Sequence, residues 1–184
     1  IEKQLKKGIV LSLPSPLEAE LAELLIKHIP SAEMVRFGKN GSDATSGAIR
    51  LARAVTGRDY VAVCGYHGWH DWYIGSTVRS LGVPVSTQKM THRFIYNDSR
   101  SLERLFKKYP RKFAAVIMEP MSYEVPKDNF LQKVKALTHR HGALLIFDEV
   151  ITGFRFDLGG AQKLFGVTPD LAAFGKSMAN GMPI

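Results

Sequence analysis

The fold prediction rests first on the stretch Ala143-Leu144-Leu145-Ile146-Phe147-Asp148-Glu149-Val150. It is a short, almost uninterrupted apolar run that ends in two acids, and Gly142 precedes it. A second run of this kind, Leu171-Ala172-Ala173-Phe174, leads through a glycine to Lys176. Short apolar runs bounded by glycine or proline are typical of strands buried on both faces, as in a parallel sheet.

Asp148 and Lys176 therefore stand at the carboxyl ends of two predicted strands. Ligands of open α/β sheets bind at that edge. One carboxylate and one amine at the same edge predict a cofactor site that holds one acid and one amine.

The rest of the chain alternates between apolar strand patterns and helical patterns. We expect helices at 16–28, 42–56, 97–108, 128–141 and 161–165, and strands at 34–37, 60–64, 94–96, 113–118, 143–147 and 171–174. Strands separated by helices of this length form βαβ units. The predicted fold class is α/β, with three α/β/α layers and a mostly parallel sheet.

Composition narrows the class of protein. The 184 residues are 45% apolar, which suits one core, and no apolar run approaches the ~18 residues that span a bilayer. Cys64 is the only cysteine, so an intrachain disulfide is excluded and a reducing compartment is favoured. The first residues are charged and do not read as a signal peptide. We expect a cytoplasmic protein without a membrane partner, and a buried Cys64 that acts as a small hydrophobic residue.

The net charge of +8 raises the question of nucleic-acid binding. Lysine and arginine are, however, spread along the chain, with only local clusters such as 3–7 and 107–112. Such clusters are typical of solvated helix ends, so we expect no nucleic-acid partner. A phosphorylated or acidic small ligand would use the positive charge equally well.

Two further segments carry chemistry at strand ends. Asn40-Gly41-Ser42-Asp43-Ala44 stands between a predicted strand and a helix, and a helix start binds phosphate through its unpaired N–H groups and dipole. Taken alone it also reads as a capped helix with Ser42 or Asp43 as the N-cap. Tyr66-His67-Gly68-Trp69-His70-Asp71-Trp72 follows another strand, and its aromatic rings suit stacking on a planar ring. Two alternatives stay open for this segment, namely an ordinary packed loop and a metal site with His67, His70 and Asp71 as ligands.

Together these segments specify one cofactor. A ring that carries a phosphate, an aldehyde and a pyridine nitrogen would use the helix start, the lysine and the acid. Pyridoxal 5'-phosphate (PLP) has these groups, and its usual protein partners are a Schiff-base lysine and an acid on the pyridinium nitrogen.

With these residues the chain resembles the class III (ornithine/GABA type) PLP-dependent aminotransferases, and within them the glutamate-1-semialdehyde aminomutase branch. The resemblance covers nearly the whole chain in one register. The segments that carry it are Met34-Val35-Arg36-Phe37, Asn40-Gly41-Ser42-Asp43-Ala44, Ala48-Ile49-Arg50-Leu51-Ala52-Arg53, Tyr66-His67-Gly68, Asp148-Glu149-Val150-Ile151-Thr152-Gly153-Phe154-Arg155, Gly159-Gly160-Ala161-Gln162, Phe165-Gly166-Val167-Thr168-Pro169-Asp170-Leu171 and Gly175-Lys176.

The resemblance implies a fold-type I PLP-transferase large domain and a role for each site residue. Lys176 would be the Schiff-base lysine and the base that moves the substrate proton, and Asp148 would pair with the pyridinium nitrogen. The remaining cofactor contacts would come from Val150 on one ring face, Tyr66 on the other, and Gly41 and Ser42 at the phosphate. Glu119 ends another strand at the same edge, and its role stays open between a supporting contact and a salt bridge.

The implied reaction moves an amino group between an amino acid or amine and a carbonyl acceptor, or within glutamate-1-semialdehyde as an aminomutase. Its partners are a small-molecule amino donor and carbonyl acceptor, and the full-length enzyme would be a homodimer. Family members are much longer than this chain. We therefore expect residues 1–184 to be part of the large domain, without the N-terminal segment and the C-terminal small domain.

Two readings from other classes compete with this one. A catalytically inactive fragment of the same fold would serve as a binding or scaffold piece. A nucleotide-binding NTPase would use Asp148-Glu149 as a Walker B acid and Gly175-Lys176-Ser177 as the end of a P-loop. That motif needs a glycine where this chain has Asp170, so the NTPase reading fails on its own pattern.

Overall fold

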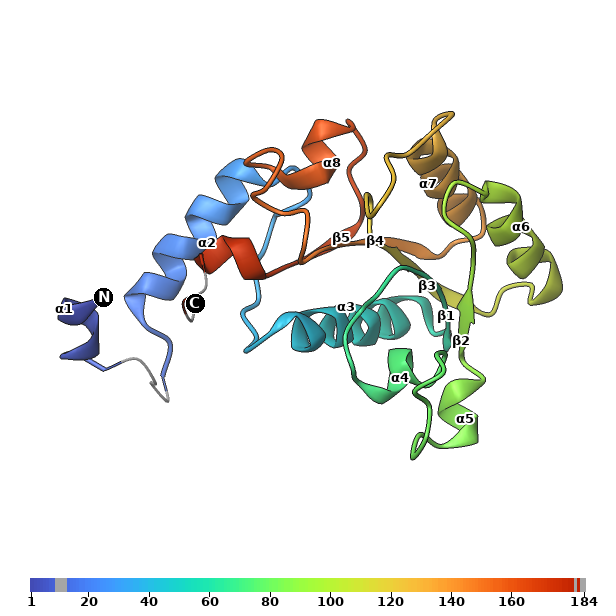
Figure 1. Cartoon of the computed structure of the whole chain (residues 1–184), viewed down its shortest axis with the longest axis horizontal. Helices are drawn as coiled ribbons and strands as arrows, with labels where there is room; N and C mark the ends of the chain where they lie inside the picture. Colours follow the sequence, from blue (N-terminus) through green and yellow to red (C-terminus); the bar gives the residue numbers. More distant parts are fainter. Residues whose placement is uncertain (9–12, 181, 183–184) are drawn as a thin grey trace.

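Five parallel strands form the centre of the computed structural model, which describes residues 1–8, 13–180 and 182 (Figure 1). The order across the sheet is β2-β1-β3-β4-β5, and every neighbouring pair is parallel. This confirms the predicted parallel sheet. The strands are β1 (Tyr60–Cys64), β2 (Thr91–Arg93), β3 (Phe113–Met118), β4 (Leu144–Glu149) and β5 (Leu171–Phe174).

Helices cover both faces of the sheet, which confirms the predicted α/β/α layers. In Figure 1, α6 and α7 lie on one side of the strands and α3 lies on the other. The longer helices are α2 (Pro16–His28), α3 (Gly41–Thr56), α6 (Ser99–Lys108) and α7 (Phe130–Arg140). The short elements are α1 (Glu2–Leu5), α4 (Asp71–Ile74), α5 (Val85–Gln88), α8 (Gly160–Leu164) and the 3-10 helix η1 (Lys176–Ala179).

The two faces of the sheet have separate apolar cores. All six residues of β3 are buried, as its uninterrupted apolar sequence predicts for a central parallel strand. Side chains alternate between the two faces along each strand. Val116 therefore joins the core beneath α6 and α7, whereas Ile117 joins the core beneath α3. Each large apolar side chain buried in these cores stabilises the fold by roughly 1.5–3 kcal/mol.

Two predicted strands are wrong. Residues 34–37 form no strand, because no strand of the described sheet pairs with this segment. The predicted strand at 94–96 lies three residues earlier in the structure, at Thr91–Arg93. The ladder with β1 ends at Arg93, and the Ile95 N–H donates to the Ser101 hydroxyl at the start of α6 instead of continuing the sheet.

The prediction that Ser42 or Asp43 caps α3 is also wrong. Asn40 is the N-cap, and its side-chain oxygen accepts hydrogen bonds from the N–H groups of Ser42 and Asp43 at 2.9 and 3.1 Å. The Asp43 carboxylate in turn accepts a hydrogen bond from the Asn40 N–H, which completes a capping box. The helix therefore begins one residue earlier than predicted.

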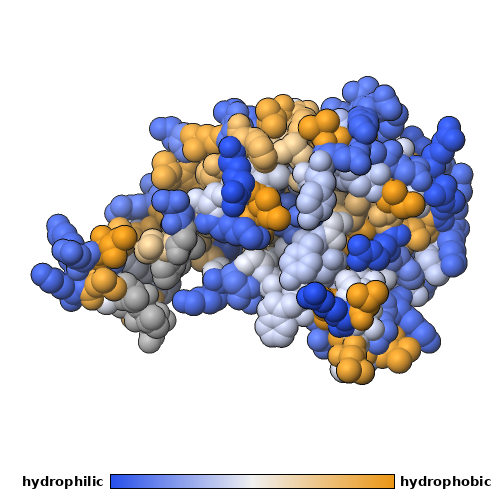
Figure 2. All heavy atoms as spheres, viewed as in Figure 1, coloured by the Kyte–Doolittle hydropathy of each residue, from blue (hydrophilic) through white to orange (hydrophobic). Residues whose placement is uncertain are grey.

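Some apolar surface remains exposed. On α2 only Leu25 is buried, whereas Leu17 and Leu24 are each 52% exposed. Figure 2 shows another apolar group of side chains at the lower end of the molecule, over α5 and the turn before it, where Val78, Leu81 and Val85 are exposed. No helix in the described part of the chain combines the length and the apolar character that crossing a membrane requires.

Candidate active site at the carboxyl edge of the sheet

A cavity of about 1480 Å³ lies at the carboxyl ends of the strands. The topology explains its position, because β4 and β5 end side by side, with Asp148 paired to Ala173 in the ladder. The segment before α3, the loop after β1 and the turn after β5 form other parts of the lining. All six residues predicted for the site line this one cavity, namely Gly41, Ser42, Tyr66, Asp148, Val150 and Lys176.

The Asp148 carboxylate is buried and lies against two hydrogen-bond donors. Its side chain is only 5% exposed. The Oδ2 atom lies 2.8 Å from His67 Nδ1, and Oδ1 accepts a hydrogen bond from the Val150 N–H at 3.1 Å. Because an ionised carboxylate only accepts, the His67 proton in this pair stands on Nδ1.

The contact of His67 with Asp148 was not predicted from the sequence. The ring is fully buried and is stacked parallel to Trp72 with centroids 6.5 Å apart. The His67 carbonyl accepts a hydrogen bond from the Thr45 hydroxyl of α3 at 2.9 Å, which fixes the backbone as well. The only signal in the sequence is that His67 follows a strand at the same sheet edge as Asp148.

Glu119 holds the backbone of Tyr66 through a hydrogen bond. The Glu119 side chain accepts a hydrogen bond from the Tyr66 N–H at 3.1 Å, which answers the question that the sequence left open. Burial raises the pKa of the Glu119 carboxyl, while the Tyr66 N–H, the His67 ring and the Lys176 ammonium act in the opposite direction. Tyr66 itself is 56% exposed and borders the cavity.

The first turn of α3 approaches Val150 closely. A Cβ atom on Gly41 would stand 2.9 and 3.0 Å from the two methyl groups of Val150, which is closer than real Cβ contacts allow. Glycine at 41 therefore lets the start of the helix reach the strand that carries Asp148. The N–H groups of Ser42 and Asp43 donate to the Asn40 side-chain oxygen, and all three residues line this end of the cavity.

Hydroxyl groups on α3 hold the loop that follows β1. The Ser42 hydroxyl accepts a hydrogen bond from the Trp69 N–H at 3.4 Å, and the Ser46 hydroxyl lies 2.7 Å from His70 Nδ1. Trp72 Nε1 donates to Ser46 as well, at 2.9 Å. His67 bonds to Asp148 and His70 lies against Ser46, and the described residues contain no group of three or more His, Cys, Asp or Glu side chains placed to hold a metal ion.

Lys176 directly follows β5 and the glycine at 175 and begins η1. Its φ angle of 45° lies in the left-handed region, which is uncommon for a lysine and costs about 1–3 kcal/mol. Such strained residues are concentrated at functional sites. The Lys176 charge partly offsets the rise that burial causes in the pKa of the Glu119 carboxyl.

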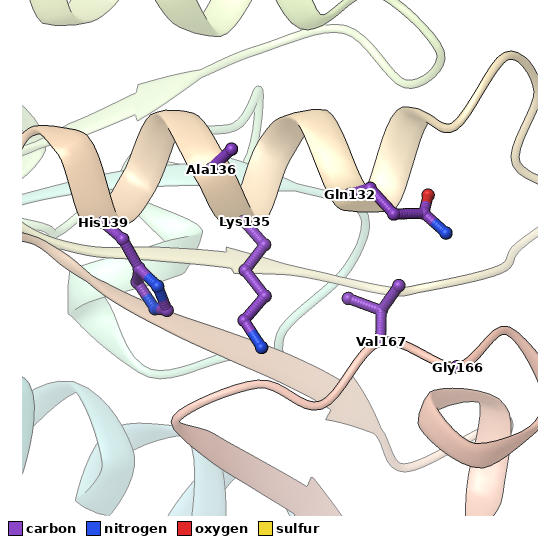
Figure 3. A pocket seen from close by; sticks show the side chains of 6 residues that line it. All are labelled: Gln132, Lys135, Ala136, His139, Gly166 and Val167. Carbon is purple, nitrogen blue, oxygen red and sulfur yellow. The ribbon is translucent and has the colours of Figure 1, made fainter.

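A second, smaller cavity of about 310 Å³ lies between α7 and the turn at Gly166 and Val167 (Figure 3). The Lys135 and His139 side chains extend from α7 toward this turn. His139 Nε2 is 2.8 Å from Asp170, whose carboxylate also accepts the Leu145 N–H at 2.7 Å. These contacts hold the start of β5 against β4, so we assign this region to the support of the sheet.

Comparison with known proteins identifies relatives over the full length of the chain. The family model described as aminotransferase class-III matches residues 1–184. Glutamate-1-semialdehyde 2,1-aminomutase from Aquifex aeolicus (strain VF5) is 42% identical over 200 residues, which cover 100% of this chain and 47% of that protein. 3-aminobutyryl-CoA aminotransferase from Cloacimonas acidaminovorans (strain Evry) is 44% identical over 184 residues, which cover 97% of this chain and 44% of that protein.

Solved structures share the fold. An omega-transaminase from Sphaerobacter thermophilus has a TM-score of 0.88 and 35% identity, covering 98% of this chain and 46% of that one. The FumI protein of Sphingopyxis sp. MTA144, in its PLP internal aldimine form, has a TM-score of 0.89 and 34% identity, covering 99% of this chain and 45% of that one. The chain thus spans about half the length of the relatives it matches.

Proposed function

Because the chain belongs to the class-III aminotransferase family, we propose that it carries the PLP site of an enzyme that transfers amino groups. The amino group would move between an amino acid or amine and a carbonyl compound. The observation that carries this proposal is the placement of Asp148 and Lys176 in one cavity, on neighbouring strands, with His67 bonded to the acid. Residues 1–184 would form part of the large domain of the enzyme.

The residues present fit PLP. Lys176 offers an amine to the aldehyde, and the buried Asp148 offers a carboxylate to a protonated ring nitrogen. The Tyr66 ring and the Val150 methyl groups offer surfaces for the two ring faces. When bound, the cofactor supplies an electron sink for the electrons of a broken substrate bond.

The start of α3 suits the cofactor phosphate. The helix dipole and the N–H groups of the first turn favour an anion there. A phosphate would replace the Asn40 side-chain oxygen as the acceptor for the N–H groups of Ser42 and Asp43, and it would meet the Ser42 hydroxyl. The close approach of Gly41 to Val150 would bring the residues that hold the phosphate near those that hold the ring.

Each polar residue would have a distinct task in the reaction. His67 holds the Asp148 carboxylate in one orientation through the 2.8 Å bond, so that its charge keeps the ring nitrogen protonated. Glu119 fixes the Tyr66 backbone and with it the stacking ring. Lys176 would take a proton from the substrate Cα and return it at a position two atoms away, a 1,3 shift in which a positioned acid–base group contributes about 10²–10⁴-fold.

The substrate pair is the finer part of the proposal. The relatives include both an aminomutase and an aminotransferase, so we carry both reactions, intramolecular transfer in glutamate-1-semialdehyde and transfer between two molecules. The single, buried Cys64 favours a cytoplasmic enzyme, and family resemblance favours a homodimer.

An absorbance spectrum with added PLP tests the proposal. We expect a band near the violet edge of the visible spectrum that is lost in Lys176→Ala. The competing function, a catalytically inactive scaffold piece, predicts no band in the intact enzyme that contains this chain. A band that survives in Lys176→Ala would contradict the assignment of the lysine.

A further inference from the structure

Glu149, the acid that follows Asp148 at the end of β4, is fully buried. Its Oε2 atom accepts hydrogen bonds from the Thr152 hydroxyl at 2.7 Å and the Ala161 N–H at 2.6 Å. Its Oε1 atom accepts two more, from the backbone N–H and the side-chain amide of Gln162, at 2.9 and 3.2 Å. A carboxylate with four donors is a rigid anchor, because moving any donor would leave a buried charge undersatisfied.

Gln162 connects Glu149 to a segment that is distant in the sequence. The side chain is 1% exposed, and its amide nitrogen is held by Glu149. The other end of the amide, Oε1, accepts the Ser31 N–H at 2.9 Å. Both polar atoms of the Gln162 amide are therefore used, which fixes the orientation of the group.

Ser31 begins a segment that forms one side of the cavity. We call residues 31–40 the cavity wall, since all of them line the cavity. Its far end is held in the same manner, because the Asp43 carboxylate accepts the N–H groups of Lys39 and Asn40 at 3.1 and 3.2 Å. The stretch between, which carries Arg36 and Phe37, belongs to no helix or strand. Its position thus depends on its two anchored ends.

We propose that Gln162, held by Glu149, is a positioning residue that sets the cavity wall and through it the affinity for substrate. Gln162 is not among the residues that line the cavity, so its effect reaches the substrate through Ser31 and the wall. The inference rests on the proposed function, which puts the reacting lysine, Lys176, in the cavity that the wall lines. It adds that Arg36 and Phe37, which line the cavity, meet the substrate in a position that depends on the buried Gln162 amide.

Kinetics of Gln162→Leu in the intact enzyme test this inference. Loss of the bond to Ser31 should raise KM for the amino donor roughly tenfold, with kcat nearly unchanged, because the wall contacts substrate and not the reacting atoms. Thr152→Val is the matched control. It removes a donor from the opposite oxygen of Glu149 and leaves the Gln162–Ser31 bond in place, so its KM should stay at the unmodified value.

Two measurements without turnover complete the test. Trypsin should cleave after Arg36 faster in Gln162→Leu than in Thr152→Val. In the unmodified protein, the Ser31 amide should exchange its hydrogen more slowly than the amides of 33–38, which remains measurable if Gln162→Leu does not fold. Equal exchange in the unmodified protein, or unchanged KM and cleavage in the variant, would overturn the inference. A missing PLP band in the unmodified enzyme would instead contradict the proposed function.

Discussion

The His67 ring and the Asp148 carboxylate form a fully enclosed pair, with Nδ1 and Oδ2 2.8 Å apart. The remaining ring nitrogen of His67, Nε2, is buried and has no hydrogen-bond partner among the described residues. The bond to Asp148 is thus the one polar contact that the structure gives the ring. We propose that this bond fixes the orientation of Asp148, whose other oxygen accepts the Val150 N–H.

Replacement of this histidine should weaken cofactor binding. His67→Phe keeps an aromatic ring against Trp72 but leaves one buried oxygen of Asp148 without a donor. We expect a loss of about 1–3 kcal/mol in the free energy of unfolding and a roughly tenfold higher dissociation constant for PLP. Urea unfolding and a PLP absorbance titration measure the two effects.

His92→Phe is the matched control for this variant. His92 also has a buried Nε2 without a partner in the described structure, and it stacks on Tyr109. It lies in β2 and does not line the cavity. Its replacement should leave the dissociation constant for PLP unchanged, and equal weakening in both variants would contradict the role given to His67.

Gly41→Ala should separate the start of α3 from β4. The new Cβ would stand 2.9 Å from a Val150 methyl group, and the stiff valine side chain has little freedom to move away. We expect the dissociation constant for PLP to rise at least about tenfold, an effect of roughly 1.4 kcal/mol. The added substitution Val150→Ala removes the clash, so the double variant should bind better than Gly41→Ala alone.

Gly47→Ala in the same helix provides the contrast. A Cβ atom at this position meets nothing within 4 Å. Alanine is favoured over glycine inside a helix by about 0.8–1 kcal/mol, so the free energy of unfolding should rise. A result in which both alanine variants weaken PLP binding alike would show that the Gly41–Val150 contact is not the cause.

Glu119→Gln should change how stability depends on pH. Burial raises the pKa of the Glu119 carboxyl in the folded protein, so the folded state binds this proton more tightly than the unfolded state does. The stability from that proton is present at low pH and is lost as pH rises through the raised pKa. Glutamine keeps an acceptor for the Tyr66 N–H without this loss. The advantage of Glu119→Gln in urea unfolding should therefore be larger at pH 7 than at pH 4.

Replacement of the surface acid Glu103 should change stability with the opposite dependence on pH. Its hydrogen bond to Lys107 lowers the pKa of the Glu103 carboxyl, so its contribution is lost as pH falls through that lowered pKa. Glu103→Gln should therefore be less stable than the unmodified protein at pH 7, and the difference should shrink toward low pH. The same pH trend in both variants would contradict the assignment of burial as the cause at Glu119.

Cys64 should be inert to alkylation in the folded protein. Burial, with the nearby charge of Glu119, raises the pKa of its thiol to about 12. Only about one thiol in 10⁴ is then ionised at pH 8, and the thiolate is the reactive form. Iodoacetamide labelling followed by mass measurement should show modification only after denaturation. Rapid labelling of the native protein would contradict this environment.

Local patterns were sufficient for most of the sheet. The runs at 113–118 and 171–174 were predicted at their observed bounds. The first is buried throughout, as an uninterrupted apolar run predicts, whereas the second forms the edge strand β5, in which only Ala173 is buried, so its predicted burial on both faces is wrong. Segments near the sheet margin were harder. Residues 34–37 have a strand-like composition, but a strand also needs a neighbour with free N–H and C=O groups, and that neighbour is a property of the whole fold.

Sequence patterns alone placed Asp148 and Lys176 at the ends of two parallel strands, since a strand end is marked within a few residues. The burial predicted for both strands holds for β4 but not for the edge strand β5. Only the tertiary structure decided which side chains support them. His67 and Asp148 are 81 positions apart, and Ser31 and Gln162 are 131 positions apart. Neither pair leaves a local pattern, because each bond forms only after separate strands and helices have been brought together by burial of the two apolar cores.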